Sequence, residues 1–461
     1  MDTDPVKVAL ISTYELGRQP FGLASPAAWL ESRGHEVVCV DTSRQQLPLD
    51  TVTQAGLVAF YLPMHTATRL AVPLIQRILK AQPEAHICCY GLYAPMNQPF
   101  LHALGVKTVI GGEFEQALVN LADGAGSDPP LISLDRLRFV TPNRSQLPVL
   151  SSYATLSLEG ASKRVGSTEA SRGCKHLCRH CPVVPVYNGV FRIVQRDVVL
   201  ADIRQQVAMG AEHITFGDPD FFNGPGHAMA LVDAVHAEFP GLTYDVTIKI
   251  EHLLKHRDLL PRLKTTGCLF IISAVESIND RVLELLDKGH TCADFVAAVR
   301  LTREAGLTLT PTFVTFTPWT TLRDFRELLE TLVDLDLVEN VAPIQLAIRL
   351  LIPAGSRLLE LPEMRAKLGE FDSSALSYQW RHDDPAVDRL CAEIQSLIQR
   401  EERQTDPQRK SRRAIFARIW DLAHDRPFPA DFHFATCGAV PFLSEAWYCC
   451  AEPTSEQLAQ I

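Results

Sequence analysis

The sequence lacks any long apolar run. Its longest apolar stretches, such as Cys268–Val275, fall far short of the ~20 residues that a helix needs to span a bilayer. The basic start of a secretory signal is also missing, because the chain begins with Met1-Asp2-Thr3-Asp4. We therefore expect a cytoplasmic protein that works without a membrane.

Positive charge is scarce as well. The chain has 44 Lys and Arg residues against 54 Asp and Glu residues, a net charge of -10. Proteins that bind nucleic acid neutralise phosphates with basic side chains, so this balance argues against a nucleic acid partner. A hydrophobic content of 46% and a charged content of 21% exclude disordered, collagen-like and fibrous proteins. The 461 residues predict roughly two to four domains.

The N-terminal part contains no G-x-G-x-x-G segment, so nicotinamide binding has no support there. Strand and helix signals nevertheless alternate, which is typical of a doubly wound parallel sheet. Ligands of such sheets bind beyond the carboxyl ends of the strands. We predict a Rossmann-like domain over residues 1–125 and a linker rich in proline and glycine over residues 126–165. The expected strands are 8–11, 37–40, 57–62, 85–90 and 108–110, with a helix at 70–79.

The alternation starts again at residue 166. It predicts a partial (β/α)6 barrel over residues 166–355, whose chemistry would collect at the carboxyl ends of its strands. The last expected strand of this barrel is 344–350. Residues 356–461 lack this alternation of strand and helix signals, and we expect a small, mostly helical C-terminal domain with a cysteine-bearing tail. The predicted fold class is therefore α/β throughout, apart from that domain.

The chain has twelve cysteines, and we expect no export signal, so these cysteines do not indicate a disulfide framework. Cys174, Cys178 and Cys181 stand out because three thiolates at spacings of four and three can bind one iron–sulfur cluster. A cubane takes four ligands, so one iron would stay open. A zinc site that adds His176 or His180 and a loop of unligated thiols are the two alternatives.

This cysteine segment, placed at the start of a predicted barrel, resembles the C-x3-C-x2-C motif of the radical S-adenosylmethionine (SAM) superfamily. Residues 6–41 and 106–122, which include Gly111-Gly112-Glu113, resemble the cobalamin-binding domain that precedes many such barrels. The ending Cys449-Cys450-Ala451-Glu452-Pro453 resembles the narrower radical SAM family named for a C-C-A-E-P or C-Sec-A-E-P tail. The resemblance implies a [4Fe-4S] cluster on the three cysteines, reductive cleavage of SAM, and an electron donor of the flavodoxin or ferredoxin type.

The resemblance also implies SAM contacts at the ends of the barrel strands. An N-terminal helix cap for the aspartates, or a structural ion pair for the other residues, is the alternative in each case. The expected cofactor-binding residues are Asp218, Asp220, Lys249, Glu251, Ser273, Glu276 and Arg349.

Two features depart from the family pattern. His180 stands where an aromatic residue usually precedes the third cysteine, which places the adenine contact in doubt. The N-terminal domain lacks the D-x-H-x-x-G motif that supplies cobalt with a histidine ligand. A domain that binds cobalamin and a domain that has lost it therefore stay open as alternatives.

The tail carries the adjacent thiols of Cys449 and Cys450, with Cys437 twelve residues before the first of them. Adjacent thiolates favour soft, thiophilic centres, and a third thiolate would complete a three-sulfur site suited to trivalent arsenic. Relatives with selenocysteine at the second tail position imply that Cys450 is chemically reactive. Packed thiols, an electron relay and the resolution of a disulfide intermediate are the alternatives.

These observations predict a radical SAM enzyme. We expect it to transfer a 3-amino-3-carboxypropyl or methyl group from SAM to a small substrate, with arsenite held by Cys437, Cys449 and Cys450 as one such substrate. The alternatives are a cobalamin-dependent methyltransferase of another small molecule, a non-catalytic sensor that binds a metalloid, and an RNA-modifying enzyme, against which the acidic charge argues.

Overall fold

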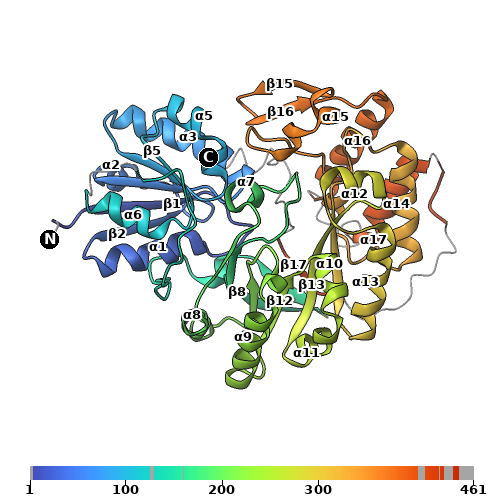
Figure 1. Ribbon diagram of the computed structural model, residues 1–461, viewed down its shortest axis with the longest axis horizontal. Helices are drawn as coiled ribbons and strands as arrows, with labels where there is room; N and C mark the ends of the chain where they lie inside the picture. Colours follow the sequence, from blue (N-terminus) through green and yellow to red (C-terminus); the bar gives the residue numbers. More distant parts are fainter. Residues whose placement is uncertain are drawn as a thin grey trace.

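The computed structural model describes residues 4–124, 129–158, 160–402, 411–424, 426–429 and 440–445. Two sheets organise these residues, one in the N-terminal part and one in the middle of the chain (Figure 1). Across the described ranges, no helix combines the length and the apolar character that crossing a bilayer requires.

The N-terminal sheet confirms the predicted doubly wound arrangement. Its six strands are parallel and follow the order β2-β1-β3-β4-β5-β6. Helices α1 and α6 cover one face, and α3 packs on the other face through its apolar side, so the strands are buried on both sides as in other parallel sheets. The strands are β1 (Lys7–Ser12), β2 (Glu36–Asp41), β3 (Leu57–Tyr61), β4 (Ile87–Tyr90), β5 (Thr108–Gly112) and β6 (Ile132–Ser133). The helices are α1 (Phe21–Ser32), α2 (Leu49–Thr53), α3 (His65–Ala81), α4 (Tyr93–Met96), α5 (Gln98–Leu104) and α6 (Glu115–Ala122).

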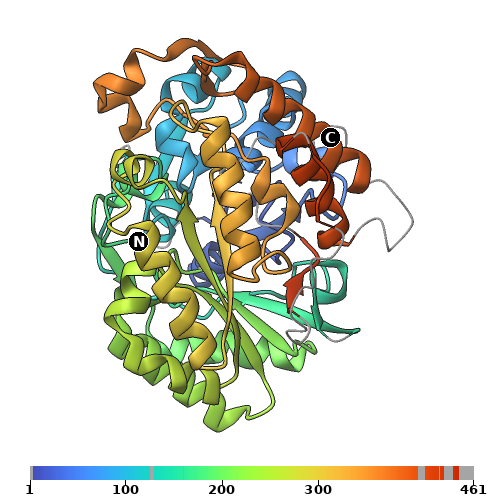
Figure 2. The ribbon, with the colours of Figure 1, turned by 90° about the vertical axis from the view of Figure 1, so that its right-hand side faces the viewer.

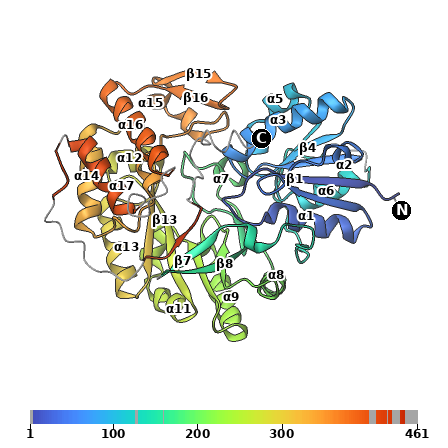
Figure 3. The ribbon, with the colours of Figure 1, turned by 180° about the vertical axis from the view of Figure 1, so that it is seen from behind.

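The second sheet is an open half-barrel in the order β14-β13-β12-β11-β8-β7-β17. Five of its strands are parallel, and β7 and β17 extend its edge as antiparallel strands, which Figure 3 shows from behind. The strands are β7 (Thr155–Leu158), β8 (Ala161–Thr168), β11 (His213–Phe216), β12 (Thr243–Thr247), β13 (Cys268–Glu276), β14 (Thr308–Phe313) and β17 (Phe442–Leu443). The helices are α8 (Arg196–Ala208), α9 (Pro225–Glu238), α10 (Ile250–Lys255), α11 (Leu260–Thr265), α12 (Asp280–Leu286), α13 (Cys292–Glu304) and α14 (Leu322–Asp334).

The partial barrel is confirmed, but its two ends differ in detail from the sequence prediction. Strand β7 lies inside the segment expected to be a linker, and β8 begins there and continues to Thr168. The last expected strand, 344–350, instead begins as the short 3-10 helix η4 (Pro343–Leu346), and only a single bridge between Arg349 and Phe316 remains of the pairing. The side chain of Gln345 accepts a hydrogen bond from the backbone of Phe313 at 3.0 Å and so takes the place of a strand partner.

The C-terminal helices α16 (Pro385–Glu402) and α17 (Arg412–His424) do not form a separate core. Their buried side chains, such as Ile394 and Ile419, belong to the same apolar cluster as the barrel helices. Figure 2 shows these helices beside the barrel. The remaining elements are η5 (Arg357–Glu360), α15 (Pro362–Arg365), and a hairpin of β15 (Leu368–Asp372) and β16 (Ser377–Trp380).

Two buried arginines join the N-terminal sheet to the half-barrel. Arg144 donates from Nε and Nη2 to the carboxylate of Asp202 on α8 at 2.7 and 2.9 Å, and from Nη1 to the side-chain oxygen of Gln19 in the N-terminal part at 2.9 Å. Arg172 donates from Nη2 to Glu115 at 2.6 Å and from Nε to Glu169 at 2.7 Å. Such paired, charge-assisted hydrogen bonds have a defined geometry. They therefore set how the carboxyl ends of the two sheets face each other.

Candidate functional site

The cysteine loop follows the carboxyl end of β8. It begins after the short strand β9 (Ser171–Gly173), which pairs with β10 (Phe191–Ile193), and it runs into α7 (Val183–Tyr187). Gly173 has a φ of +76°, and a Cβ added there would lie 2.4 Å from the carbonyl oxygen of Val190. Only glycine fits this position. The closeness of this carbonyl group therefore explains why residue 173 is a glycine.

The three cysteines line one cavity of about 270 Å³ between the half-barrel and the N-terminal sheet. Burial raises the pKa of the Cys174 thiol to about 11. A thiolate is the form that binds metal, so this site needs a cation to hold Cys174 deprotonated. Among the described residues, the sulfurs of Cys174, Cys178 and Cys181 do not lie close enough together to share a single ion. Their arrangement fits a polynuclear iron–sulfur cluster with three protein ligands.

Asp218 holds the start of the cysteine loop. Its two carboxylate oxygens accept hydrogen bonds from the backbone N–H of Ala170 at 2.9 Å and from Ser171 Oγ at 2.6 Å. Burial raises the pKa of Asp218 to about 7. The residue lines the cavity as expected, but both of its oxygens already have partners in the loop.

Asp220 has the helix-capping role that the sequence offered as one alternative, and its contact with SAM stays a prediction. Its Oδ1 accepts from the backbone of Phe222 at 3.1 Å, so it caps the short helix η2 (Phe221–Asn223). Its Oδ2 faces His252 and His176. Burial would raise the pKa of this carboxyl, but the two histidines outweigh burial and hold the pKa below its usual value.

Glu276 stands at an irregular end of β13, where its φ is +68° and the register with β14 shifts. Its Oε1 lies 3.0 Å from His180 Nε2 and accepts from Lys288 Nζ at 3.2 Å. Burial would raise the pKa of Glu276, but Lys288 and His180 outweigh it and hold this pKa at about 2. The cavity therefore has a charged carboxylate and a buried ammonium group on the wall next to the cysteine loop.

Lys249 and Glu251 lie close together after β12. Lys249 lines the cavity, and its Nζ is 3.8 Å from Glu251 Oε2. Glu251 is partly exposed, and it is not one of the described residues that line the cavity.

Two expected cofactor contacts, Ser273 and Arg349, lie away from the cavity. Ser273 is buried inside β13, and because side chains alternate along a strand, it points away from the face on which Ala274 lines the cavity. Arg349 donates from Nη1 to Asp388 at 2.7 Å, and its guanidinium carbon lies 3.5 Å from the ring centroid of Trp380. The guanidinium group of Arg349 is therefore engaged in a structural ion pair instead of a ligand contact.

The tail residues Cys437, Cys449 and Cys450 lie outside the described residues. Their proposed roles therefore stay predictions.

Sequence reasoning did not single out His252 or Lys288. His252 lies three residues after Lys249, on the helix that follows a strand end, so the rule that sites collect at strand ends points toward it. Lys288 follows α12 rather than a strand, and no local pattern distinguishes it from a surface lysine.

The N-terminal sheet forms the opposite wall of the cavity. Glu15 follows β1, and Pro63 and Met64 follow β3. The cavity volume of about 270 Å³ lies close to the lower end of the roughly 300–1,000 Å³ that small-molecule and cofactor sites span. A Cβ on Gly111 would lie 2.2 Å from the Pro95 ring, so the protein itself fills the space beside this glycine. The cavity thus has walls from both sheets.

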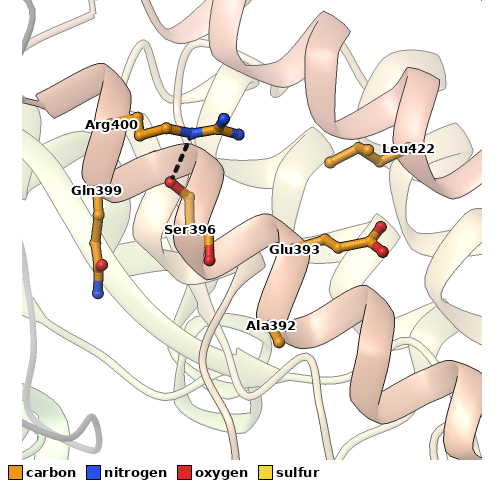
Figure 4. A pocket seen from close by; sticks show the side chains of 6 residues that line it. All are labelled: Ala392, Glu393, Ser396, Gln399, Arg400 and Leu422. Carbon is orange, nitrogen blue, oxygen red and sulfur yellow. Dashed lines mark hydrogen bonds between the residues drawn. The ribbon is translucent and has the colours of Figure 1, made fainter.

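A second, shallower cavity lies on the outer surface of α16 and α17 (Figure 4). There Arg400 Nε donates to the carbonyl oxygen of Ser396 at 3.2 Å. The described residues that line it include no cysteine or histidine. It offers none of the chemistry of the first cavity.

Comparison with known proteins agrees with this geometry. Residues 168–332 match the sequence model of the radical SAM superfamily. A tRNA-2-methylthio-N(6)-dimethylallyladenosine synthase of Bordetella petrii is 28% identical over 194 residues, which are 38% of each chain. The Aliivibrio fischeri enzyme of the same name is 25% identical over 244 residues, which are 50% of each chain. The chain thus spans half or less of the length of these curated relatives.

Two solved structures share the fold. The cobalamin-dependent SAM radical enzyme OxsB, with aqua-cobalamin bound, superposes with a TM-score of 0.64 at 14% identity, over 92% of this chain and 72% of that one. The radical SAM methyltransferase TsrM of Kitasatospora setae, with cobalamin and a [4Fe-4S] cluster bound, gives a TM-score of 0.55 at 19% identity, over 72% and 70% of the two chains. The chain therefore contains a radical SAM superfamily domain, in the fold of cobalamin-dependent radical SAM enzymes.

Proposed function

We propose that the protein cleaves SAM reductively at a [4Fe-4S] cluster held by Cys174, Cys178 and Cys181, and transfers an alkyl group of SAM to a small substrate. The observation that carries this proposal is the cavity itself. Three thiols on one loop and two buried lysines from other elements line the same space of about 270 Å³. When bound, such a cluster supplies one electron to the sulfonium group of SAM.

Other residues of this chain would bind SAM, fix the cysteine loop and exclude water. Lys249 and Lys288 place positive charge where the methionine carboxylate of SAM would bind, and Glu276 holds Lys288 and His180 in place. Asp218 fixes the start of the cysteine loop. The N-terminal sheet closes the other side and limits water, which strengthens these charge interactions and protects a reactive radical.

The transferred group is proposed to be 3-amino-3-carboxypropyl. This group needs no cobalt carrier, and the N-terminal domain lacks the D-x-H-x-x-G motif that supplies cobalt with a histidine ligand. One electron, from a donor of the flavodoxin or ferredoxin type, breaks the carbon–sulfur bond to give 5'-methylthioadenosine and a carbon radical. With arsenic(III) held by the three tail thiolates as acceptor, a second electron and a proton complete the new carbon–arsenic bond and release one of the thiols.

Arsenite is proposed as the acceptor because of the tail thiols. Cys437, Cys449 and Cys450 together would bind a soft trivalent centre and present it to the cavity. The likeness to OxsB and TsrM favours a second candidate, the transfer of a methyl group through cobalamin.

Product analysis tests these proposals. The protein is reconstituted with iron and sulfide without oxygen, and is then given SAM and dithionite, with and without arsenite. Arsenite-dependent 5'-methylthioadenosine supports carboxypropyl transfer. Formation of 5'-deoxyadenosine with S-adenosylhomocysteine, dependent on added cobalamin, supports methyl transfer instead.

Variants make the test specific. Cys178→Ala is expected to lose the cluster and all SAM cleavage, whereas Cys292→Ala, a half-buried thiol that is not among the cavity residues, keeps both. An iron-loaded protein that leaves SAM intact would overturn the proposed function. SAM cleavage that depends on added tRNA rather than on arsenite would overturn the choice of a small substrate.

A further inference from the structure

Three side chains from separate elements converge behind Cys174. His176 belongs to the cysteine loop, Asp220 follows β11, and His252 lies on α10. Asp220 Oδ2 is 2.6 Å from His252 Nδ1 and 3.5 Å from His176 Nε2. The centroids of the two imidazole rings are 4.7 Å apart.

These three atoms are buried and lack hydrogen bonds. Asp220 is 1% exposed and His252 is 5% exposed. Although the atoms are close, none of the three makes a hydrogen bond of acceptable direction with another described residue. Leaving such polar atoms unsatisfied in the interior is unfavourable, and native proteins rarely do so without an ion or water. A cation that accepts a lone pair from each of the three atoms would satisfy all of them.

We propose that His176, Asp220 and His252 bind a divalent first-row transition-metal ion. Two histidines and one carboxylate form a donor set that such ions prefer. Ligands about 2.0–2.2 Å from a tetrahedral ion lie about 3.3–3.6 Å from one another. The contact of 3.5 Å between Asp220 and His176 matches this spacing. The contact of 2.6 Å to His252 needs to open by less than an ångström, and His252, which lies outside the close group of Cys174, His176 and Asp220, needs to approach His176.

The surroundings orient these ligands in the way that metal sites require. His176 Nδ1 lies 3.5 Å from Glu251 Oε2, and a carboxylate beside the second ring nitrogen is the usual partner of a ligating histidine. The other oxygen of Asp220 accepts from the backbone of Phe222 at 3.1 Å, which leaves only Oδ2 for the ion. Glu251, which is not among the described residues that line the cavity, would thereby orient His176.

The open side of this site faces the cavity. His176 and Asp220 line the cavity, whereas His252 is not among its lining residues and supports the ion from behind. The sulfur of Cys174 lies within 4.8 Å of the ligand atoms of His176 and Asp220. An ion held here would therefore keep free coordination positions directed toward a substrate beside the cysteine loop. This inference does not depend on SAM cleavage.

Cobalt binding by the full-length chain tests the site. The variant Cys174→Ala/Cys178→Ala/Cys181→Ala is stripped with chelator and titrated with Co²⁺. We expect one equivalent to bind with visible d–d absorption and without a thiolate-to-cobalt charge-transfer band. Addition of His252→Ala or Asp220→Asn to this variant should weaken that binding at least tenfold. Asp220→Asn retains a side-chain acceptor for the η2 cap, so its fold should be preserved.

His256→Ala is the matched control. Its ring lies beside that of His252, with centroids 5.6 Å apart, but it is not part of the converging triad. This variant should bind Co²⁺ as the parent does. The proposal is overturned if the triple-cysteine variant binds no Co²⁺, if it binds Co²⁺ only with a thiolate band, or if His252→Ala and His256→Ala bind it equally.

The reconstituted wild-type protein supplies a second readout. Elemental analysis after incubation with Zn²⁺ should find one zinc per chain in addition to the iron. Asp220→Asn should lose the zinc and keep the iron with its visible absorption. The proposed function fails if SAM stays intact, whereas the metal site fails if zinc content is unchanged in Asp220→Asn, so the two failures are distinguishable.

Discussion

Lys288 Nζ lies 3.2 Å from Glu276 Oε1 in the wall of the cavity, and the two residues are 3% and 6% exposed. His180 Nε2, from the cysteine loop, lies 3.0 Å from the same oxygen. A strand end, the loop after α12 and the cysteine loop thus meet at one carboxylate. Burial lowers the pKa of Lys288, but Glu276 and the nearby thiols of Cys178 and Cys181 raise it above its usual value. Lys288 therefore places a positive charge beside these two cysteines.

Lys288→Met should destabilise the protein by about 3–5 kcal/mol, because it leaves the buried carboxylate of Glu276 without its partner. Urea unfolding of the two proteins measures this difference. The double variant Glu276→Gln/Lys288→Met buries no charge and should be more stable than Lys288→Met alone. Equal stability of wild type and Lys288→Met would contradict the structural role of the pair.

Glu15 should make stability fall as the pH rises. Burial and, second, the charge of Glu169 raise the pKa of Glu15 from 4.5 to about 8. The folded protein therefore holds a proton that the unfolded chain releases, and this contribution is complete below pH 4.5 and is lost as the pH rises through 8. Within this window, the free energy of unfolding falls by up to about 1.4 kcal/mol for each pH unit.

Glu15→Gln should flatten this dependence, measured as the free energy of unfolding at several pH values. Glu84→Gln, whose side chain is 94% exposed, is the matched control and should keep the slope of the wild type. An unchanged slope in Glu15→Gln would show that this carboxyl is ionised in the folded protein.

Arg172→Met should weaken the connection between the two sheets. Arg172 is buried among Glu113, Glu115 and Glu169, and without it these carboxylates face one another. We expect a loss of about 3–5 kcal/mol in the free energy of unfolding. Arg204→Met, which removes an exposed pair with Glu238, should change stability little. Thermal unfolding compares the two variants, and equal melting temperatures would contradict the prediction.

Gly173→Ala should lower the iron content after reconstitution. Its φ of +76° and the distance of 2.4 Å between an added Cβ and Val190 O force the loop to move, and with it Cys174. In Gly226→Ala, a Cβ meets nothing within 4 Å, and the variant should load iron normally. Iron analysis and visible absorption provide the measurement. Full iron loading of Gly173→Ala would show that the loop tolerates this shift.

Much of the fold was predictable because neighbouring residues determine local structure. The apolar run of β1 and the strand-to-helix alternation indicate buried parallel strands wherever they occur. The spacing of Cys174, Cys178 and Cys181 requires one loop, and the strand-end rule places Asp218, Asp220, Lys249 and Glu276 near it. These features depend on contacts within a few residues, so they can be predicted from the sequence.

The partners of these side chains depended on tertiary structure. Ser273 and Glu276 share a strand, but the pleat turns Ser273 away from the cavity, whereas Glu276 lies in its wall. Arg349 meets Asp388, which lies 39 residues away, because α16 packs on the barrel.

Local sequence patterns specify the two sheets, the cysteine loop and the edge at which a site would form. Long-range packing brings His180, Lys288 and Glu276 together, and it brings His252 to Asp220 and His176. His180 and Glu276 are 96 residues apart, and local preference does not act over such a distance. Strand register and helix docking bring these side chains together, and both depend on the burial of the whole apolar core.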